Sequence, residues 1–356
     1  MKRILFGVCV AALLVGCGKK DRELHIYGWP DYISPSVIKA FENEYGCRVK
    51  LDTFDSNETM YANLKAGAKC YDVINPSSYH LDELVRDGLV MELDHSRLET
   101  VLRNFDKSAI DLILDKDFKY SVPYAESYAG ICYLKDKVPA NMDMETWAVF
   151  GNPEFRGKTT LLDDIREVMC AGLIACGYSV NSVNPDEIAA AVEKIRGWMQ
   201  YARKLDAESY KFEVPSGASW VAHGYSFDSK QVIHGDPDED VPPRRDVGFA
   251  LPKEGFAITY DVLVISSKSH DPELAYAFLN FMYEPKNALA NMEYVFGPMA
   301  VKPALDMLRK DIKDLIVLDA ETLKRGRVIE PISGHPGAVE LYEKAWEEIK
   351  SMGRWR

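Results

Sequence analysis

The order of apolar and polar residues near the start of the chain predicts a strand, a helix and a second strand. A short apolar run at residues 24–27 predicts the first strand. Ser34 and Pro35 then supply an N-cap and a first helical residue, apolar residues follow at helical spacing, and Gly46 ends the helix. Residues 47–54 alternate in polarity, which predicts the second strand and completes a βαβ unit.

The same alternation continues beyond this unit. Residues 55–58 (DSNE) have the sequence of a capping box, with Glu58 three residues after Asp55, so we expect a helix to begin here. The run YDVIN at 71–75 predicts a third strand, and PSSY at 76–79 opens another helix. This part of the chain therefore predicts an α/β lobe with a largely parallel sheet.

A second block of strands and helices follows residue 124. We expect further strands at residues 130–134, 158–162, 248–251 and 256–265. We expect further helices to begin at Asp163-Asp164, Asn184 and Asp271, and a last one at 338–350. Because strand-rich sequence returns late in the chain, we expect two α/β lobes between which the chain crosses more than once. Ligands of such lobes bind outside the carboxyl ends of the parallel strands.

The first residues have a different pattern, which predicts export rather than a fold. Two basic residues precede an apolar run over residues 4–15 that ends in LVG before Cys17. Residues 1–16 therefore predict a secretory signal of the bacterial lipoprotein type, too short to span a bilayer. We expect lipid on Cys17, a tether over residues 17–23, and a protein anchored on the periplasmic side of a membrane. A plain signal peptide and a short membrane anchor are the alternatives.

Charge and cysteine content narrow the function classes. The net charge of −12 would become −14 after loss of the leader with its two basic residues, which disfavours nucleic acid as a partner and mildly favours cationic ligands. Five cysteines follow Cys17, and none has zinc-site or C-x-x-C spacing. We expect Cys47, Cys70 and Cys132 to be buried free thiols, whereas a disulfide between Cys170 and Cys176 stays open. The sequence predicts no metal site and no cofactor.

Aromatic, hydroxyl and carboxyl side chains follow three of the predicted strands. They are Trp29, Asp31 and Tyr32 after 24–27, Ser77 and Tyr79 after 71–75, and Asp163, Asp164 and Glu167 after 158–162. A carboxylate without a cationic partner is costly to bury, and ring faces attract ammonium groups and cover methylene groups. This combination favours a flexible diamine or triamine as the ligand.

Each of these acids also has an ordinary structural explanation. Asp163 is placed to cap the following helix, and Glu167 could pair with Arg166 or Lys158. Asp31 could stabilise the turn before the first helix. Only their expected position at one sheet edge, beside aromatic residues, favours a binding site.

Several segments of the chain resemble the spermidine/putrescine-binding receptors of bacterial ABC transporters. In order along nearly the whole chain after the leader, they are WPDY (29–32), DSNETMYANL (55–64), YDVINPSSY (71–79), LLDDIREV (161–168), and PKEG with YDVL (252–263). The resemblance implies an α/β, two-lobe periplasmic binding protein fold, type II-like, with a cleft between lobes joined by crossing hinge segments. We expect residues 24–127 and 260–306 in one lobe and residues 128–259 and 307–356 in the other.

The resemblance implies a receptor that captures spermidine, putrescine or both and delivers them to an ABC permease without catalysing a reaction. By position, it implies ligand contacts from Trp29, Asp31, Tyr32, Ser77, Tyr79, Asp164, Glu167, Tyr225, Asp228 and Asp261. Two positions depart from the family pattern: Tyr225 stands where a tryptophan is usual, and Thr259 where an aromatic residue is usual. Tyr260 should face the other side of its strand, because strand side chains alternate, so one ring wall is expected to be thin.

Two other functions are compatible with the same residues. A receptor of this fold for a quaternary amine, an amino acid or a sugar would also use aromatic walls. A hydrolase would need two carboxylates that flank a bond, which the adjacent Asp163 and Asp164 cannot easily do. The sequence does not distinguish spermidine from putrescine, and it does not indicate the oligomeric state.

Overall fold

The structure is a computed structural model that describes residues 22–67, 69–235 and 241–353. Within these residues the strands are β1 (Arg22–Gly28), β2 (Cys47–Thr53), β3 (Val73–Ile74), β4 (Val122–Leu134), β5 (Thr159–Leu161), β6 (Ala202–Leu205), β7 (Val221–Tyr225), β8 (Val247–Ala250), β9 (Phe256–Ile265) and β10 (Gly326–Val328). The strand order is β2-β1-β3-β9-β4-β7-β5-β6, with β10 paired to β9 and β8 paired to β4.

Helices surround this sheet. Those before β7 are α1 (Pro35–Tyr45), α2 (Asn57–Ala66), α3 (Leu81–Arg86), α4 (Glu99–Asn104), α5 (Ile165–Ala175), α6 (Pro185–Met199) and α7 (Tyr210–Ser216). Those after β7 are α8 (Ser226–His234), α9 (Pro272–Met282), α10 (Pro285–Val295), α11 (Lys302–Met307), α12 (Lys310–Ile316), α13 (Ala320–Leu323) and α14 (Ala338–Ser351). No helix of the described residues is long and apolar enough to cross a membrane.

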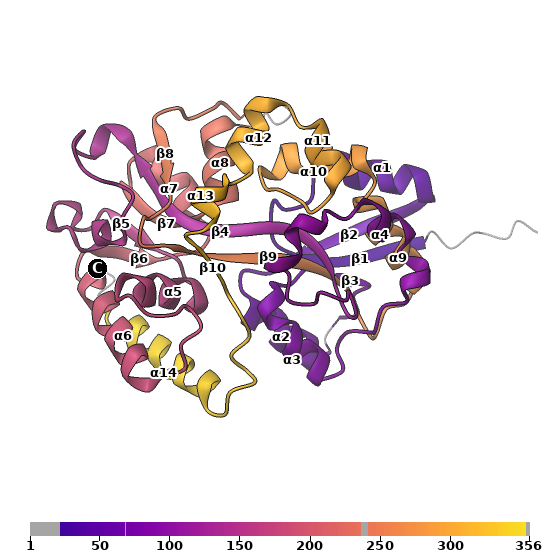
Figure 1. Ribbon diagram of the computed structural model, residues 1–356, viewed down its shortest axis with the longest axis horizontal. Coiled ribbons are helices and arrows are strands. Elements are labelled where there is room, and N and C mark those ends of the chain that lie inside the picture. The colour runs from indigo at the N-terminus through magenta and orange to yellow at the C-terminus, as the bar shows by residue number, and fades with distance from the viewer. Residues whose placement is uncertain (1–21, 68, 236–240, 354–356) are drawn as a thin grey trace, which may run out of the picture.

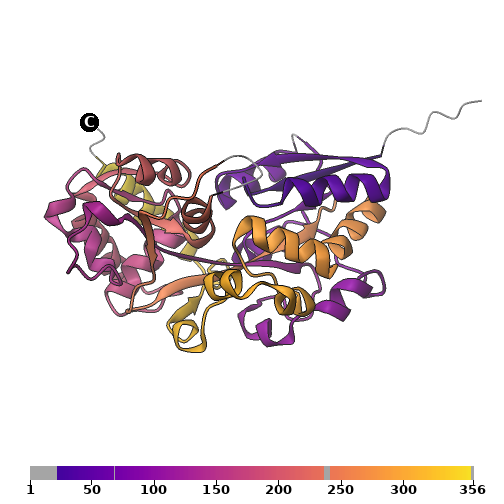
Figure 2. The same cartoon turned by 90° about the horizontal axis from the view of Figure 1, so that it is seen from above.

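The molecule has two lobes joined by two long strands (Figure 1). In the first lobe β1 pairs in parallel with β2 and β3, and in the second β5 pairs in parallel with β6 and β7. β4 and β9 run antiparallel between the lobes, with Ala125 opposite Asp261 and Ser127 opposite Thr259. Figure 2 shows the lobes from above, on either side of these crossing strands.

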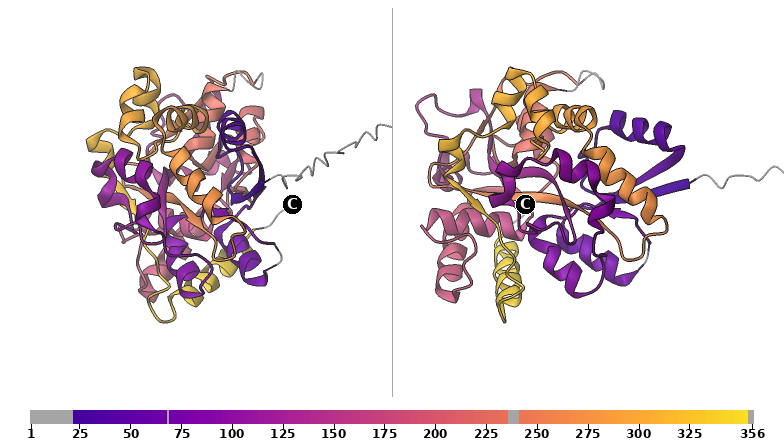
Figure 3. Two further views of the ribbon diagram at one scale, coloured as in Figure 1. Left: turned by 90° about the vertical axis from the view of Figure 1, so that its right-hand side faces the viewer. Right: turned by 45° about the vertical axis from the view of Figure 1, so that its right-hand side comes forward.

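Each lobe has its own apolar core. The first-lobe core gathers buried side chains from β1, α1, α9 and α10, and the second-lobe core gathers them from α5, α6, β7 and α14. The helix α14 packs beside α6, as the right-hand view of Figure 3 shows. Leu308, Ile312 and Ile316 pack in the first-lobe core, although the predicted boundary after residue 306 assigns them to the other lobe. The lobe boundaries stay a prediction.

Most predicted elements lie where the sequence placed them, but two predicted helix caps are wrong. Gly46 ends α1 in the left-handed conformation, with φ 60°, as predicted. Ser56, not Asp55, caps α2 by accepting a hydrogen bond from the Thr59 amide. Asp164, not Asp163, caps α5 by accepting one from the Glu167 amide. In both places the cap lies one residue later than predicted, because each helix begins one residue further along.

The structure can also be compared with the predictions for the start of the chain and for the cysteines. Residues 1–21, which include Cys17 and the predicted signal, lie outside the described residues, as do residues 236–240. Arg22 and Glu23, predicted as the end of the tether, belong to β1. The cysteines Cys47, Cys70, Cys132, Cys170 and Cys176 are all free, although Cys70 is only partly buried.

Candidate functional site

A cavity lies between the lobes and is lined by residues of both. All ten side chains that the resemblance pointed to line it: Trp29, Asp31, Tyr32, Ser77, Tyr79, Asp164, Glu167, Tyr225, Asp228 and Asp261. Seven further residues complete the lining: Pro30, Asp55, Ser127, Ala207, Glu208, Phe227 and Thr259. That these residues contact a ligand stays a prediction, but the structure does bring them together.

The topology of the sheet explains why these residues line the cavity. The carboxyl ends of β1, β2 and β3 in one lobe, and of β5, β6 and β7 in the other, all face the cavity, and the residues just beyond these ends supply most of its wall. Sequence reasoning missed Asp55 because it assigned this residue to a cap, although it follows the second predicted strand. It missed Glu208 because β6 had no recognisable pattern, and Ser127 because the first half of β4 was not predicted.

Asp261, on the crossing strand β9, lies near the middle of the cavity and is buried. Its carboxylate accepts hydrogen bonds from the Tyr32 hydroxyl at 2.6 Å and the Ser77 hydroxyl at 2.7 Å. Burial raises the pKa of Asp261 to about 6, against the lowering effect of these two hydroxyls, and the charge of Asp164 raises it further. The carboxylate therefore lacks a positive partner that would stabilise its ionised form.

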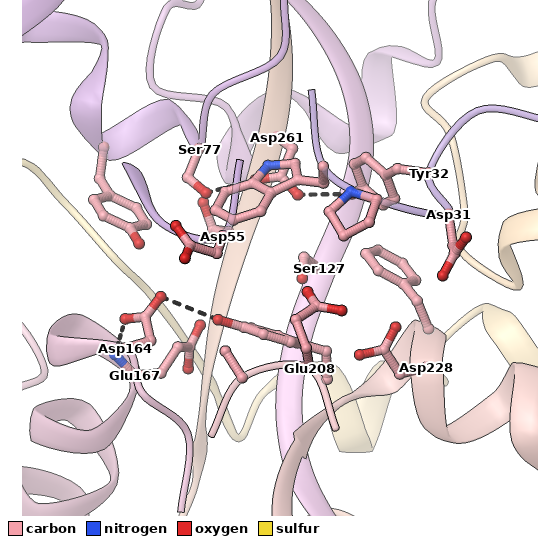
Figure 4. A pocket seen from close by; sticks show the side chains of 17 residues that line it. Asp31, Tyr32, Asp55, Ser77, Ser127, Asp164, Glu167, Glu208, Asp228 and Asp261 are labelled. Carbon is pink, nitrogen blue, oxygen red and sulfur yellow. Dashed lines mark hydrogen bonds between the residues drawn. The ribbon is translucent and has the colours of Figure 1, made fainter. Parts of the chain in front are cut away.

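Asp164 and Glu167, which we call the Asp164 pair, lie at one end of the cavity (Figure 4). Asp164 accepts hydrogen bonds from the Tyr225 hydroxyl and the Glu167 amide, each at 3.0 Å. Glu167 is buried, and its Oε2 has no hydrogen-bond partner among the described residues. Burial and the charge of Asp164 raise the pKa of Glu167 well above its ordinary value, although Arg166 opposes this.

Three more acids form what we call the Lys211 cluster: Asp31 and Asp228, on the right of Figure 4, and Glu208, near its middle. The Lys211 ammonium lies 2.9 Å from Asp31 Oδ2 and 3.2 Å from Glu208 Oε2. Asp228 accepts a 2.7 Å hydrogen bond from the Tyr210 hydroxyl. Burial raises the pKa of Asp228, and the charge of Lys211 opposes that rise. Asp31 therefore pairs across the cleft instead of stabilising its own turn.

Five rings line the cavity: Trp29, Tyr32, Tyr79, Tyr225 and Phe227. The ring centroids of Tyr32 and Phe227 lie 5.1 Å apart. Tyr260 packs on the other face of its strand against Ile113 and Phe118, as strand alternation predicted. Thr259 indeed leaves that part of the wall without a ring. Phe227, which the sequence analysis did not single out, adds an aromatic wall from the start of α8.

The chemistry of this lining favours a flexible organic cation. Asp55, Asp164, Glu167 and Asp261 make no ion pair with a basic residue of the described chain. No group of histidine, cysteine, aspartate or glutamate side chains in the described part is arranged to hold a metal ion. An ammonium group would restore the charge balance of the buried acids, and the rings would cover the methylene groups between two such ammoniums.

Comparisons with known proteins agree with this chemistry. The family model described as bacterial extracellular solute-binding protein matches residues 36–313. The chain is 33% identical to a putrescine/cadaverine-binding protein of Pseudomonas aeruginosa, covering 98% of this chain and 99% of that protein. It is 30% identical to the spermidine/putrescine-binding periplasmic protein of Escherichia coli, covering 93% and 92%.

Solved structures give the same picture. A putative spermidine/putrescine ABC transporter protein from Listeria monocytogenes superposes with a TM-score of 0.84 at 31% identity, covering 94% of this chain and 100% of that one. The TpPotD lipoprotein of Treponema pallidum superposes with a TM-score of 0.81 at 28% identity, covering 92% and 99%. The similarity therefore extends over both lobes and the strands between them.

Proposed function

Because this chain belongs to the family of bacterial extracellular solute-binding proteins, we propose that it is a receptor that captures polyamines and delivers them to an ABC transporter permease. It is a binding protein and not an enzyme. The observation that carries the ligand class is a set of three acids without a basic partner among the described residues, Asp164, Glu167 and Asp261, in a cavity walled by aromatic rings. Glu167 and Asp261 are buried.

We assign ligand contacts to both lobes. The Asp164 pair would hold one ammonium and Asp261 another, while Trp29 and Tyr225 would cover the methylene groups between them. Since these residues come from different lobes and from a crossing strand, a bound polyamine would tie the lobes together. Binding would thus favour a closed arrangement of the two lobes over an open one.

The proposal includes a lipid anchor at Cys17. Its support is the sequence alone: a basic start, a short apolar run and a cysteine after LVG. The Treponema pallidum protein of the same fold is a lipoprotein, which is consistent with such an anchor. Mass spectrometry of the protein expressed in bacteria would show a diacylglyceryl mass on Cys17, and Cys17→Ser would release the protein from the membrane fraction.

Calorimetric titration tests the ligand class. We expect heat with putrescine, cadaverine or spermidine and none with arginine. The second candidate is a receptor for a quaternary amine, which the aromatic rings alone would favour. Tight binding of choline with no response to any polyamine would support that candidate and reject our proposal.

Substitutions in the cavity test the assigned acids. We expect Glu167→Gln to weaken polyamine binding tenfold or more, about 1.4 kcal/mol, because it removes a negative charge that faces the ligand. Asp163→Asn is the matched control, since Asp163 is the exposed neighbour of the Asp164 pair and does not line the cavity. An unchanged affinity in a folded Glu167→Gln protein would remove Glu167 from the site.

A further inference from the structure

Lys211 does not itself line the cavity, but it places a positive charge directly against two of the acids that do. Among the described residues it is the one basic side chain that forms an ion pair with an acid lining the cavity. It belongs to α7 in the second lobe, whereas its partner Asp31 follows β1 in the first. Its side chain is only 10% exposed, so the ammonium is largely shielded from solvent beside these acids.

The surroundings of Lys211 resemble those expected for a bound amine. The ammonium contacts Asp31 at 2.9 Å and Glu208 at 3.2 Å, and the charge of Asp228 acts on it as well. Burial lowers the pKa of Lys211, but these three acids together outweigh that effect and raise it, so the group stays charged at neutral pH. The Lys211 cluster is thus already occupied by an ammonium that belongs to the protein.

The acids outside the Lys211 cluster determine how many ammonium groups of a ligand the cavity can bind. Two positions have acids without a basic partner in the described chain: the Asp164 pair at one end, with Glu167 buried, and the buried Asp261 between the two ends of Figure 4. A third amine, continuing toward the other end, would meet the Lys211 cluster. There it would have to displace the Lys211 ammonium or approach it, and like charges at short range repel each other.

We propose that Lys211 is a specificity-determining residue that fills the third amine position, so that the cleft prefers ligands with two ammonium groups over ligands with three. This inference rests on the proposed function and deepens it, because it selects diamines such as putrescine and cadaverine over triamines such as spermidine. The residue acts by occupying acids and by repelling a further ammonium, and it needs no contact with a bound diamine.

The test is to titrate the wild-type chain and Lys211→Met with putrescine and with spermidine. We expect the wild type to bind putrescine at least tenfold more tightly than spermidine. We expect Lys211→Met to reduce this ratio tenfold or more, chiefly because spermidine binds more tightly once the acids of the Lys211 cluster are free. Lys211→Arg keeps the charge and should keep the preference within about threefold.

Lys253→Met is the matched control. Lys253 also pairs with two acids, Asp143 and Glu145, but on the surface away from the cavity, so its loss should leave both affinities unchanged. Circular dichroism and thermal melting check that the variants fold, and Lys211→Gln serves if the methionine variant does not. Asp31 and Glu208 are themselves 55% and 44% exposed, so water can solvate them once Lys211 is removed.

The outcomes separate the two proposals. A wild-type chain that binds spermidine more tightly than putrescine overturns the role of Lys211 but supports a polyamine receptor. An unchanged preference in a folded Lys211→Met protein would also overturn the role of Lys211 and support a polyamine receptor. If neither polyamine binds the wild type, the proposed function fails and this inference fails with it.

Discussion

The buried carboxylate of Asp261 favours the binding of a cation but lowers the stability of the ligand-free protein at neutral pH. Its carboxyl is buried near the middle of the cavity, and burial raises its pKa to about 6 from an ordinary 3.8. In the ligand-free protein the stability due to this raised pKa is fully present below pH 3.8 and is lost as the pH rises through about 6. At neutral pH the ionised group therefore costs stability, by up to roughly 3 kcal/mol.

We accordingly predict that Asp261→Asn raises the melting temperature of the ligand-free chain at pH 7 while it weakens putrescine binding tenfold or more. Asp72→Asn is the informative contrast. Asp72 is just as buried, but it accepts backbone and hydroxyl hydrogen bonds from His25, Ser269 and His270, so its substitution should lower the melting temperature. Equal destabilisation by both substitutions would contradict our account of Asp261.

The raised pKa values also predict that binding releases protons. Glu167 and Asp261 hold protons more readily than ordinary acids, and a bound ammonium would lower both pKa values. Affinity for putrescine should therefore fall about tenfold or more between pH 7 and pH 5, as Asp261 becomes protonated. Calorimetry at pH 6 in buffers with different ionisation enthalpies should show proton release, and Asp261→Asn should reduce it. Equal heats in all buffers would argue against a raised pKa of Asp261 in the free protein.

Elements, more than single residues, decide which parts of the site the sequence could predict. Strong apolar runs located β1, β3 and β5, and hence the acids and rings that follow them. By contrast, β6 and β7 carry partly polar or short sequences, and α7 contains Pro215, so no local pattern marked that region. Lys211, Glu208 and Phe227 were missed for this reason, since only tertiary packing brings them to the cavity.

One element-level prediction concerns the wall that Phe227 forms. Gly297, after α10, packs against this ring, and a Cβ added at Gly297 would lie 2.1 Å from Phe227 Cε1. Gly297→Ala should therefore displace the ring, weaken putrescine binding by threefold or more and cost about 1–3 kcal/mol of stability. Gly197→Ala, on α6 with nothing within 4 Å of the added atom, should leave binding unchanged. Normal affinity in Gly297→Ala would show that the Phe227 wall does not contribute.

At the scale of the whole molecule, the acids of the cavity bear on the opening and closing of the lobes. Seven carboxylates line the cavity, from both lobes and from β9, and Lys211 is the one basic residue of the described chain paired with any of them. Closing the cleft without ligand brings these charges together and removes water from them. The Lys211–Asp31 pair across the cleft offsets part of this cost, and a bound diamine would offset more.

We therefore predict that saturating putrescine lowers the radius of gyration measured by small-angle X-ray scattering. A population can shift only as far as the ligand favours one state over the other, so the change should follow the calorimetric binding curve. The double substitution Glu167→Gln and Asp261→Asn removes two of the repelling charges, and we expect this protein to be more compact than the wild type without ligand. A radius that stays constant while calorimetry shows saturation would mean that polyamine binding and lobe closure are not coupled in this chain.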